Sequence, residues 1–381
     1  MNILIGVSGS IAIYKTCELI RLFIKNGDNV KVVMSKSATK FISPLTFEAL
    51  TRNKVLTNNS EDWSKDLNHI DYAKWADIFI IAPATANTIN KASNGIADNL
   101  LLQTYLACNK PTLFAPAANT NMYLHKTTQE SFKKLTIIEA DYGLLACGEE
   151  GIGKMANVED IFLKAKRLLY QEDFWKNKNI VVTAGGSIEK IDDVRFISNF
   201  SSGKMGEAIA KAFYIKGANV TLISSKNHNL IKEIKQIKVN SAKEYLEAIL
   251  NEKIDYLIMA AAISDYKPIY KKGKLKKEEI GERFILELEK NIDILESIKH
   301  KPFKKIGFKA EMDEKNALNY AKKTLINKNL DAICLNLLTK NSFGSNENEI
   351  IFITKDKEIK LDQDTKENIS LKLCDVIKKY I

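Results

Sequence analysis

The chain has few residues of the kinds that build disulfide frameworks and zinc sites. Its five cysteines are scattered and form no C-x-x-C pair, so neither kind of site is indicated. No apolar run approaches the ~20 residues of a membrane-spanning helix, and we expect no membrane association. The apolar N-terminus lacks the basic segment and small-residue cleavage site of a secretory signal. We therefore expect a cytoplasmic protein.

Acidic residues are outnumbered by basic ones, and the 381-residue chain carries a formal net charge of +10. The densest basic stretch, residues 267–277, is not part of a long basic stripe interleaved with aromatic side chains, which nucleic-acid binding would favour. We therefore expect anionic small molecules as ligands and no nucleic acid. The length predicts two or three domains of roughly 150 residues.

The first half opens with a strand, a small-residue turn, a helix and a second strand. Residues 2–7 (NILIGV) form the first strand, and a helix follows over about 11–26. The second strand is expected over 29–34. This order is typical of a parallel α/β sheet.

The same order restarts near residue 179. A strand over 179–184 precedes a Gly-Gly-Ser turn, and after an insertion a helix is expected over 204–216 and a strand over 219–224. The sequence therefore predicts an α/β protein with two doubly wound, Rossmann-like domains in tandem. The first spans residues 1–178, with a helical linker over about 157–178, and the second spans 179–381.

Small-residue turns after a first strand favour phosphate, because backbone N–H groups and a helix N-terminus can approach it. Neither turn is a G-x-G-x-x-G, and the second strand ends near Ser35 and Ser37 rather than at an acidic residue. A mononucleotide phosphate is therefore favoured over a dinucleotide. A nicotinamide oxidoreductase remains the alternative that the tandem pattern alone would allow.

Three further segments of the first half carry small polar residues or glycine. Residues 78–88 and 113–122 each run from a strand into a small polar loop, and such loops bind ligands at the carboxyl ends of open sheets. Residues 143–155 hold four glycines around Cys147. That composition predicts a mobile loop rather than a helix or strand, with a thiol that could deliver a proton.

Together, several motifs resemble the flavin-dependent cysteine decarboxylases, in particular the phosphopantothenoylcysteine decarboxylases, over the whole first half. They are GVSGSIA from Gly6, His69 within NHIDYAKWAD, APATAN from Ala82, residues 116–122, and ACG from Ala146 with the following Gly-x-Gly-Lys-Met. The resemblance implies an N-terminal flavoprotein whose FMN is bound by Ser8, Gly9, Ser10, Ser35, Ser37, Pro83, Ala84 and Thr85.

The resemblance also implies a mechanism, in which flavin oxidises the substrate thiol so that carbon dioxide can leave, and then returns a hydride. By the same resemblance, His69 is the acid/base group, Asn119 binds the substrate carboxylate and Cys147 donates a proton. Ala118 departs from the family, which usually has methionine there. Loss of any one of these three residues would have indicated a non-catalytic binding subunit, and all three are present.

The second half contains its own anion-binding pattern. Ser201, Ser202, Gly203 and Lys204 stand directly before a helix, which combines N–H groups, hydroxyls and an ammonium at one point. Residues 257–262 (LIMAAA) are expected to form a buried strand, followed by Ser-Asp-Tyr. The lysine run that ends in Lys274, Lys276 and Lys277 could close over a triphosphate.

This half resembles the phosphopantothenate–cysteine ligases, through TAGG-S, R-x-I-S-N-x-S-S-G-K-M-G, A-A-x-x-D-Y, KLKK and GFKAE. The order of the halves matches bifunctional bacterial proteins of coenzyme A biosynthesis. The resemblance implies that the 4′-phosphopantothenate carboxylate attacks a nucleotide, usually CTP in bacteria, and that cysteine then displaces CMP to give 4′-phosphopantothenoylcysteine. Mg²⁺ is expected with the triphosphate.

The same resemblance assigns roles to residues of the second half. Asn199 contacts the acyl nucleotide, and Lys274 assists its chemistry. Thr324 stands where the family often has lysine, and Lys322 or Lys323 could substitute for it. A homo-oligomer is implied, with decarboxylase trimers joined by ligase dimers into a dodecamer. The residues expected around the nucleotide are Met259, Ala260, Ala261, Asp265, Lys274, Ile292, Asp293, Ile294, Leu295, Phe308 and Lys328.

Overall fold

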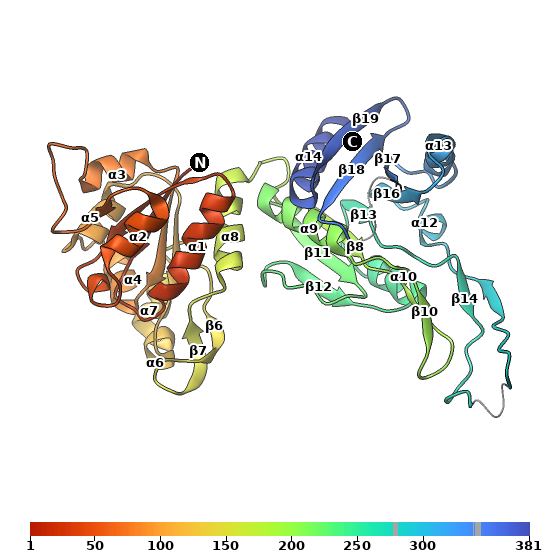
Figure 1. Ribbon diagram of the computed structural model, residues 1–381, viewed down its shortest axis with the longest axis horizontal. Helices are drawn as coiled ribbons and strands as arrows, with labels where there is room; N and C mark the ends of the chain where they lie inside the picture. Colours follow the sequence, from red (N-terminus) through yellow and green to blue (C-terminus); the bar gives the residue numbers. More distant parts are fainter. Residues whose placement is uncertain (277–280, 338, 340–343) are drawn as a thin grey trace. The chain divides into compact units, whose positions relative to one another are not determined.

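The computed structural model describes residues 1–276, 281–337, 339 and 344–381 (Figure 1). The chain forms two compact units, Met1–Tyr170 and Gln171–Ile381. The division lies a few residues before the boundary expected at residue 178, because the helix of the expected linker belongs to the first unit and ends at Tyr170. In the described part of the chain, no helix is long and apolar enough to cross a membrane.

The first unit is built on a five-stranded parallel sheet in the order β3-β2-β1-β4-β5. Strands β2 and β3 follow one another on one side of β1, and β4 and β5 follow one another on its other side. The direction in which strands are added therefore switches between β1 and β4. This is the expected doubly wound topology. The strands are β1 (Asn2–Val7), β2 (Asn29–Met34), β3 (Val55–Leu56), β4 (Ile78–Ala84) and β5 (Thr112–Pro116).

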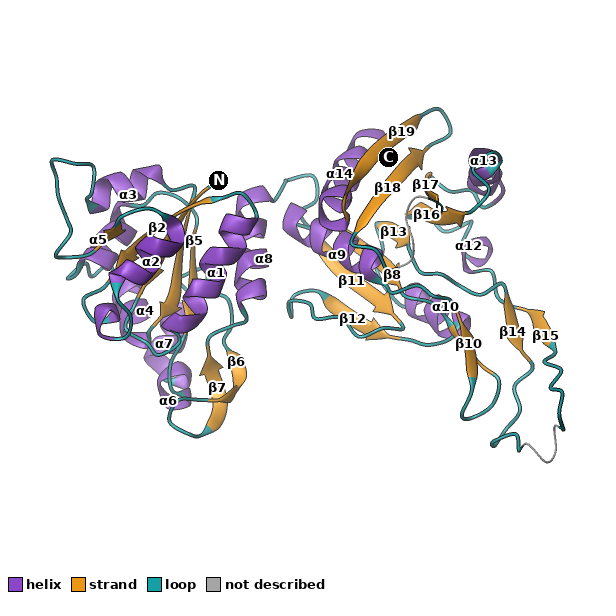
Figure 2. Ribbon diagram, viewed as in Figure 1, coloured by secondary structure: helices purple, strands orange, loops and turns teal. Residues whose placement is uncertain are grey.

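Two groups of helices cover this sheet (Figure 2). Helix α1 contacts α2 and α8 in one group, and in the other α5 contacts α3 and α4, which in turn contacts α7. All seven residues of β4 are buried, as expected for a central parallel strand with helices on both faces. The helices are α1 (Ile13–Lys25), α2 (Pro44–Thr51), α3 (His69–Trp75), α4 (Ala86–Ser93), α5 (Leu100–Ala107), α6 (Thr120–Leu124), α7 (Lys126–Phe132) and α8 (Val158–Tyr170), with a short 3-10 turn η1 (Ala38–Lys40).

The glycine-rich segment around Cys147 is not the irregular loop that its composition predicted. It forms an antiparallel hairpin of β6 (Asp141–Leu144) and β7 (Glu150–Lys154), with Cys147 in the connection. Gly153 has a φ of 134°, and a Cβ there would lie 2.2 Å from the carbonyl oxygen of Ala118. The glycines thus let the hairpin lie directly on the backbone after β5, and this close contact is what composition alone did not show.

The second unit contains an eight-stranded sheet in the order β12-β11-β8-β13-β16-β17-β18-β19. Its first six strands are parallel, and β18 and β19 add an antiparallel edge. The direction switches between β8 and β13, which again confirms the doubly wound prediction. The strands are β8 (Asn179–Ala184), β11 (Asn219–Ser224), β12 (Lys235–Lys238), β13 (Tyr256–Met259), β16 (Lys304–Glu311), β17 (Ala332–Leu337), β18 (Glu347–Ile353) and β19 (Glu358–Thr365).

Strand β13 ends at Met259, three residues earlier than the predicted 257–262. The remaining alanines form the turn at its carboxyl end, where Ala262 bridges to Gly186. Helix α9 has the predicted bounds and ends at Gly217, whose φ of 108° suits glycine. The helices among the described residues of this unit are α9 (Lys204–Lys216), α10 (Ala242–Leu250), α12 (Ile294–Ser297), α13 (Ala317–Asn327) and α14 (Lys366–Tyr380).

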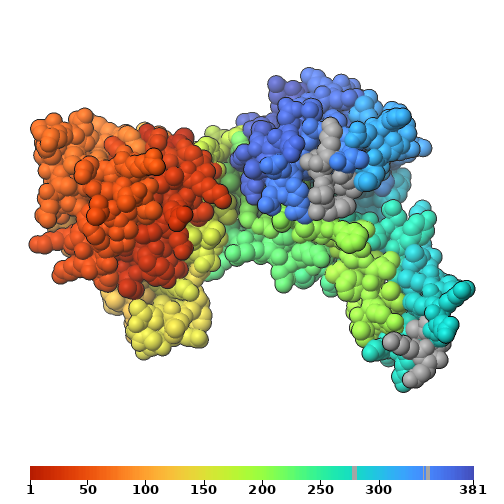
Figure 3. All heavy atoms as spheres, viewed as in Figure 1, coloured from red at the N-terminus to blue at the C-terminus, as the bar shows by residue number. Residues whose placement is uncertain are grey.

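Two small hairpins project from this sheet, and their atoms lie in the yellow-green and teal lobes at the lower right of Figure 3. One consists of β9 (Ile188–Lys190) and β10 (Phe196–Ser198), and the other of β14 (Tyr266–Pro268) and β15 (Leu288–Lys290). The loops beyond them are held together, because backbone N–H groups of Gly273 and Leu275 donate to the carboxylates of Asp193 and Asp192. Lys274 lies between these two anchored residues.

Candidate functional sites

Ser8 directly follows β1 and lies at the switch point of the first sheet, between the carboxyl ends of β1 and β4. Its buried hydroxyl donates to the carbonyl oxygen of Pro83 at 2.7 Å and accepts from the N–H of Thr85 at 2.9 Å. The hydroxyl therefore joins the carboxyl ends of β1 and β4. It shapes the crevice in which open α/β sheets bind ligands.

The proposed flavin residues that follow β2 lie next to the turn after β1. The hydroxyls of Ser35 and Ser37 are 3.1 Å apart, and a Cβ on Gly9 would lie 2.7 Å from the Cβ of Ser37. Ser10 continues the same turn and accepts from the N–H of Ala12. Four of the predicted residues are thus brought together at one end of the sheet.

A cavity of about 530 Å³ adjoins this turn. Three segments line it: the start of α1, the loop after β5 and the β6–β7 hairpin. In it, the side-chain amide of Asn119 lies 3.5 Å from the sulfur of Cys147. The lining residues are Ser10, Ile11, Ala12, Tyr14, Lys15, Ala117, Ala118, Asn119, Leu144, Leu145, Ala146, Cys147, Gly153, Lys154 and Met155.

Two lysines make this cavity electropositive. The ammonium of Lys15 donates to the carbonyl oxygen of Met155 at 2.9 Å. Burial lowers the pKa of Lys15, and the neighbouring charge of Lys154 lowers it further. The cavity therefore suits an anionic ligand. Our sequence reasoning missed Lys15, although a basic residue one turn beyond Ile11 could have indicated a cation beside the phosphate-binding turn.

His69 is not among the residues that line this cavity. It begins α3, where Asn68 caps the helix, and its Nδ1 lies 3.0 Å from a carboxylate oxygen of Glu61. The ring of Trp63 contacts the imidazole edge-on, with 5.4 Å between the ring centroids. Within one chain, the structure thus brings together Asn119 and Cys147 but not His69.

The switch point of the second sheet is organised around Ala262. Its N–H donates to the carbonyl oxygen of Gly185, and its own carbonyl oxygen accepts from the N–H of Ser187. The side-chain amide of Asn199 donates to the same carbonyl oxygen at 2.9 Å. Asn199 therefore lies at the turn where β8 and β13 diverge.

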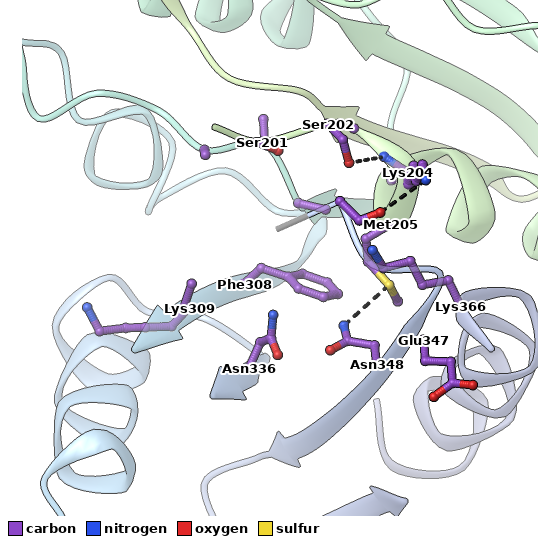
Figure 4. A pocket seen from close by; sticks show the side chains of 17 residues that line it. Ser201, Ser202, Lys204, Met205, Phe308, Lys309, Asn336, Glu347, Asn348 and Lys366 are labelled. Carbon is purple, nitrogen blue, oxygen red and sulfur yellow. Dashed lines mark hydrogen bonds between the residues drawn. The ribbon is translucent and has the colours of Figure 1, made fainter. Parts of the chain in front are cut away.

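Two neighbouring cavities open at this point, with volumes of about 160 and 370 Å³. Ala261 and Phe308 line both of them, so the cavities adjoin. The smaller is lined by residues 201–206, Ala260–Ala262, Phe308–Ala310, Asn336, Gly344, Glu347, Asn348 and Lys366 (Figure 4). The larger is lined by Met259, Ala261, residues 263–266 and 290–295, Phe308 and Lys328.

The predicted nucleotide residues fall into these two cavities, with one exception. Ala260 and the four residues from Ser201 to Lys204 line the smaller cavity. Lys274, the exception, is exposed and lines neither of the two cavities, and Asn199, which was predicted to contact the acyl nucleotide, does not line them either. The others line the larger cavity: Met259, Ala261, Asp265, Ile292, Asp293, Ile294, Leu295, Phe308 and Lys328.

Asp293 and Lys328 form an ion pair of 2.7 Å at the wall of the larger cavity. Burial alone would raise the pKa of Asp293, but its hydrogen bond with Lys328 contributes to a net lowering. Asp293 also caps α12 by accepting from the N–H of Glu296. Its charge is therefore held in place before any ligand binds.

The lysines suggested as substitutes at position 324 do not line either cavity. Lys322 forms an ion pair of 2.6 Å with Glu358. The hydroxyl of Thr324 donates to the carbonyl oxygen of Tyr320 within α13. Lys277, at the end of the lysine run, lies outside the described residues.

Comparisons with known proteins agree with this division of the chain. The model of the Flavoprotein family matches residues 1–169, and the model described as DNA/pantothenate metabolism flavoprotein C-terminal domain matches residues 175–381. The chain is 38% identical to the coenzyme A biosynthesis bifunctional protein CoaBC of Borreliella burgdorferi, over 99% of this chain and 98% of the relative.

It is also 40% identical to the protein of the same name from Bacillus subtilis, over 93% of this chain and 91% of that protein. The chain belongs to the family of coenzyme A biosynthesis bifunctional proteins. A solved structure of the C-terminal domain of a CoaBC protein is 34% identical and covers 55% of this chain and 97% of its own, with a TM-score of 0.46.

Membership of this family makes the protein a bifunctional enzyme, with a flavoprotein decarboxylase domain followed by a ligase domain. The sequence-based assignment of the family is confirmed. Family membership argues against the two alternative functions, a nicotinamide oxidoreductase and a non-catalytic binding subunit. Several residues of the smaller ligase cavity were missed by our sequence reasoning, among them Asn336, Asn348 and Lys366, because each is far in sequence from the motif after β8.

Proposed function

We propose that the protein converts 4′-phosphopantothenate and cysteine into 4′-phosphopantetheine in two reactions. The ligase domain uses CTP to join the two substrates, and the decarboxylase domain removes carbon dioxide from the resulting 4′-phosphopantothenoylcysteine. The adjoining pair of cavities at the switch point of the second sheet carries this proposal. The larger cavity suits a nucleoside, and the smaller cavity suits phosphates.

In the ligase reaction, the carboxylate of 4′-phosphopantothenate attacks the α-phosphorus and pyrophosphate leaves. The cysteine amine then attacks the acyl carbon, and CMP leaves. We assign the nucleoside to the larger cavity and the phosphates to the loop from Ser201 to Lys204. The position of Asn199 beside the turn between the two cavities supports its contact with the acyl nucleotide.

Magnesium is proposed as a companion of the triphosphate. The described side chains include no cluster of three or more histidine, cysteine, aspartate or glutamate residues that could hold a metal ion. Phosphate oxygens and water would therefore supply most of the ligands, since Mg²⁺ usually keeps several waters in such sites.

FMN is the cofactor proposed for the decarboxylase domain, and the residues present fit it. Ser10, Ser35 and Ser37 offer hydroxyls beside the N-terminus of α1, which has no side-chain cap among the described contacts. Hydroxyls beside the N-terminus of a helix suit a terminal phosphate. When bound, the flavin supplies the oxidation of the substrate thiol and the return of a hydride.

The protein's own side chains bind the substrate and move protons. Asn119 binds the substrate carboxylate, and Cys147 delivers a proton, which their separation of 3.5 Å supports. The positive charges of Lys15 and Lys154 favour an anionic substrate in the same cavity. We propose His69 as the acid/base group near the flavin.

His69 does not line this cavity within one chain, which supports a site shared between chains. We propose decarboxylase trimers in which His69 of one chain faces the cavity of another, joined by ligase dimers into a dodecamer. The assembly would act in the cytoplasm on small molecules alone.

A coupled assay tests the proposal. Purified protein receives 4′-phosphopantothenate, cysteine, CTP and magnesium, and the release of pyrophosphate, carbon dioxide and 4′-phosphopantetheine is followed. All three products are expected, and ATP in place of CTP measures nucleotide choice. A yellow, folded protein that forms none of them would contradict both assignments, whereas pyrophosphate alone would contradict the decarboxylase assignment.

Replacing Lys274 by glutamine separates the two reactions. Lys274→Gln should lower ligation by about 100-fold or more, because the family resemblance assigns the charge of Lys274 to the chemistry of the acyl nucleotide, and charge at a reacting phosphate speeds its reaction. Decarboxylation of supplied 4′-phosphopantothenoylcysteine should stay unchanged. The neighbouring Lys271→Gln serves as a control, and equal loss of both activities in Lys274→Gln would indicate misfolding instead.

A further inference from the structure

Two lysines from distant parts of the second unit converge on one short loop. The ammonium of Lys204, at the start of α9, donates to the carbonyl oxygen of Gly344 at 3.0 Å and to the side chain of Asn346 at 2.9 Å. The ammonium of Lys366, at the start of α14, donates to the carbonyl oxygen of Ser345. The three acceptors are consecutive residues, so the loop holds both ammonium groups near each other.

Both lysines line the smaller cavity beside Ser201 and Ser202 (Figure 4). Lys366 is only 9% exposed, although lysine is rarely buried without a partner of opposite charge. Burial lowers the pKa of Lys366, and the charge of Lys204 lowers it further. Each observation indicates positive charge that an anion would stabilise.

The carboxylates near this point are engaged elsewhere or do not pair with the two lysines. Among the described residues, neither Lys204 nor Lys366 forms an ion pair, and their acceptors are carbonyl and amide oxygens. Glu347 accepts from Gln363, and Glu207 pairs with Lys211 and His228. Glu367 raises the pKa of Lys366, but its effect is smaller than that of Lys204.

We propose that Lys366, together with Lys204, binds the two terminal phosphates of the nucleotide and holds them as they leave as pyrophosphate. The inference rests on the proposed ligase function and adds a residue from the C-terminal helix to its phosphate site. A nucleotide with its nucleoside in the larger cavity would reach the smaller one past Ala261 and Phe308, which line both. When the bond between the α- and β-phosphates breaks, the electron pair leaves with pyrophosphate, and the two ammonium groups offset that charge.

The test compares Lys366→Met with Lys372→Met in the full-length protein. Lys372 lies on the same helix, but its ammonium pairs with Asp364. Lys366→Met should raise the KM for CTP and the inhibition constant of inorganic pyrophosphate by about ten-fold or more, since charge-assisted hydrogen bonds are the stronger kind. The KM values for 4′-phosphopantothenate and cysteine should change less than about two-fold, and Lys372→Met should leave all of them unchanged.

Lys366→Gln and Lys366→Arg distinguish binding from folding. Glutamine can still donate to the carbonyl oxygen of Ser345 but carries no charge, so it should show the same kinetic defect with a stable fold. Arginine should recover part of the affinity. Unchanged constants in folded Lys366→Gln, or an equal rise in the KM of every substrate, would overturn the inference.

Direct calorimetric titration with inorganic pyrophosphate tests the two-lysine site without depending on ligase activity. If the wild-type protein forms no product from CTP, the ligase assignment fails. Binding of pyrophosphate that is weakened in Lys366→Gln and unchanged in Lys372→Met would still support the two-lysine site. Equal binding by all three proteins would reject it.

Discussion

At the scale of single residues, the exposure and the neighbours of Cys147 support its proposed role as a proton donor. Its side chain is exposed, its sulfur faces the amide of Asn119, and Glu149 lies 3.8 Å away on the same turn. An accessible thiol beside a binding amide suits proton delivery to a bound substrate. The buried Cys334 and Cys374 differ, because burial raises the pKa of each thiol and keeps it protonated.

Substitution of Cys147 should separate the release of carbon dioxide from the final reduction in the decarboxylase reaction. Cys147→Ser should still release carbon dioxide but accumulate the intermediate before the final reduction, because the proton donor is lost. Carbon dioxide and 4′-phosphopantetheine are measured in parallel, and Cys108→Ser, at the end of α5, is the control. Full formation of 4′-phosphopantetheine by Cys147→Ser would remove this thiol from the mechanism.

A second group, formed by Ser224, His228 and Glu207, packs against the loop from Ser201 to Lys204. The hydroxyl of Ser224 lies 2.9 Å from Nε2 of His228, whose Nδ1 lies 2.7 Å from Glu207. This order resembles a hydrolytic triad, but the side chain of His228 is only 3% exposed and no substrate could reach it. A Cβ on Gly203 would lie 2.9 Å from the imidazole ring, so the group supports the loop instead.

The charge of Glu207 should make stability depend on pH. Burial alone would raise its pKa, but hydrogen bonds from His228 and Lys211 lower the pKa from 4.5 to about 2. A lowered pKa stabilises the folded state above about pH 4.5, and this contribution is lost as the pH falls through about 2. The wild type should therefore be more stable than Glu207→Gln at pH 7, and the difference should shrink in acid.

Urea unfolding of both proteins across this pH range measures the effect. Glu130→Gln, which loses an exposed ion pair with Lys133, is the control and should change stability little at any pH. A difference between wild type and Glu207→Gln that stays constant from pH 7 to pH 3 would contradict the assignment.

At the scale of elements, the β6–β7 hairpin positions Cys147. The N–H of Ala118 donates to the carbonyl oxygen of Gly153, so β7 pairs with the backbone just before Asn119. Asn119 in turn caps α6 by accepting from the N–H of Asn121. The hairpin and this helix cap therefore set the distance between the amide and the thiol together.

A methyl group on Gly153 should disturb this arrangement. Gly153→Ala would place a carbon 2.2 Å from the carbonyl oxygen of Ala118 and force a φ of 134° on a residue with a side chain. Decarboxylation should fall by about ten-fold or more while ligation is retained. The control is Gly95→Ala, which also has positive φ but meets no neighbouring atom. Equal effects of both variants would show that strain alone is responsible.

At the scale of the whole molecule, each unit has its own sheet and its own buried core. Units that fold separately should respond separately to their ligands, because a ligand stabilises only the fold that binds it. Calorimetry should therefore show two unfolding transitions. FMN should raise the temperature of one, and CTP with magnesium should raise that of the other. A single transition that both ligands shift equally would contradict independent units.

Much of this organisation follows from local sequence. Strands β1, β2, β8 and β11 and helix α9 have the predicted bounds, because continuous apolar runs and flanking glycines mark buried parallel strands and helix ends. The anion-binding turns and the family resemblance were also visible there. These features depend on neighbours within a few residues, which a sequence displays directly.

Tertiary structure decided the relations between distant residues. It turned the glycine-rich segment into a hairpin, since the partner of Gly153 lies in the loop after β5. It left His69 outside the cavity that Cys147 lines, and it brought Lys366 to Lys204 by packing α14 against α9. Local patterns cannot show such pairs, because sheet order and helix docking determine which carboxyl ends meet and which charges share a cavity.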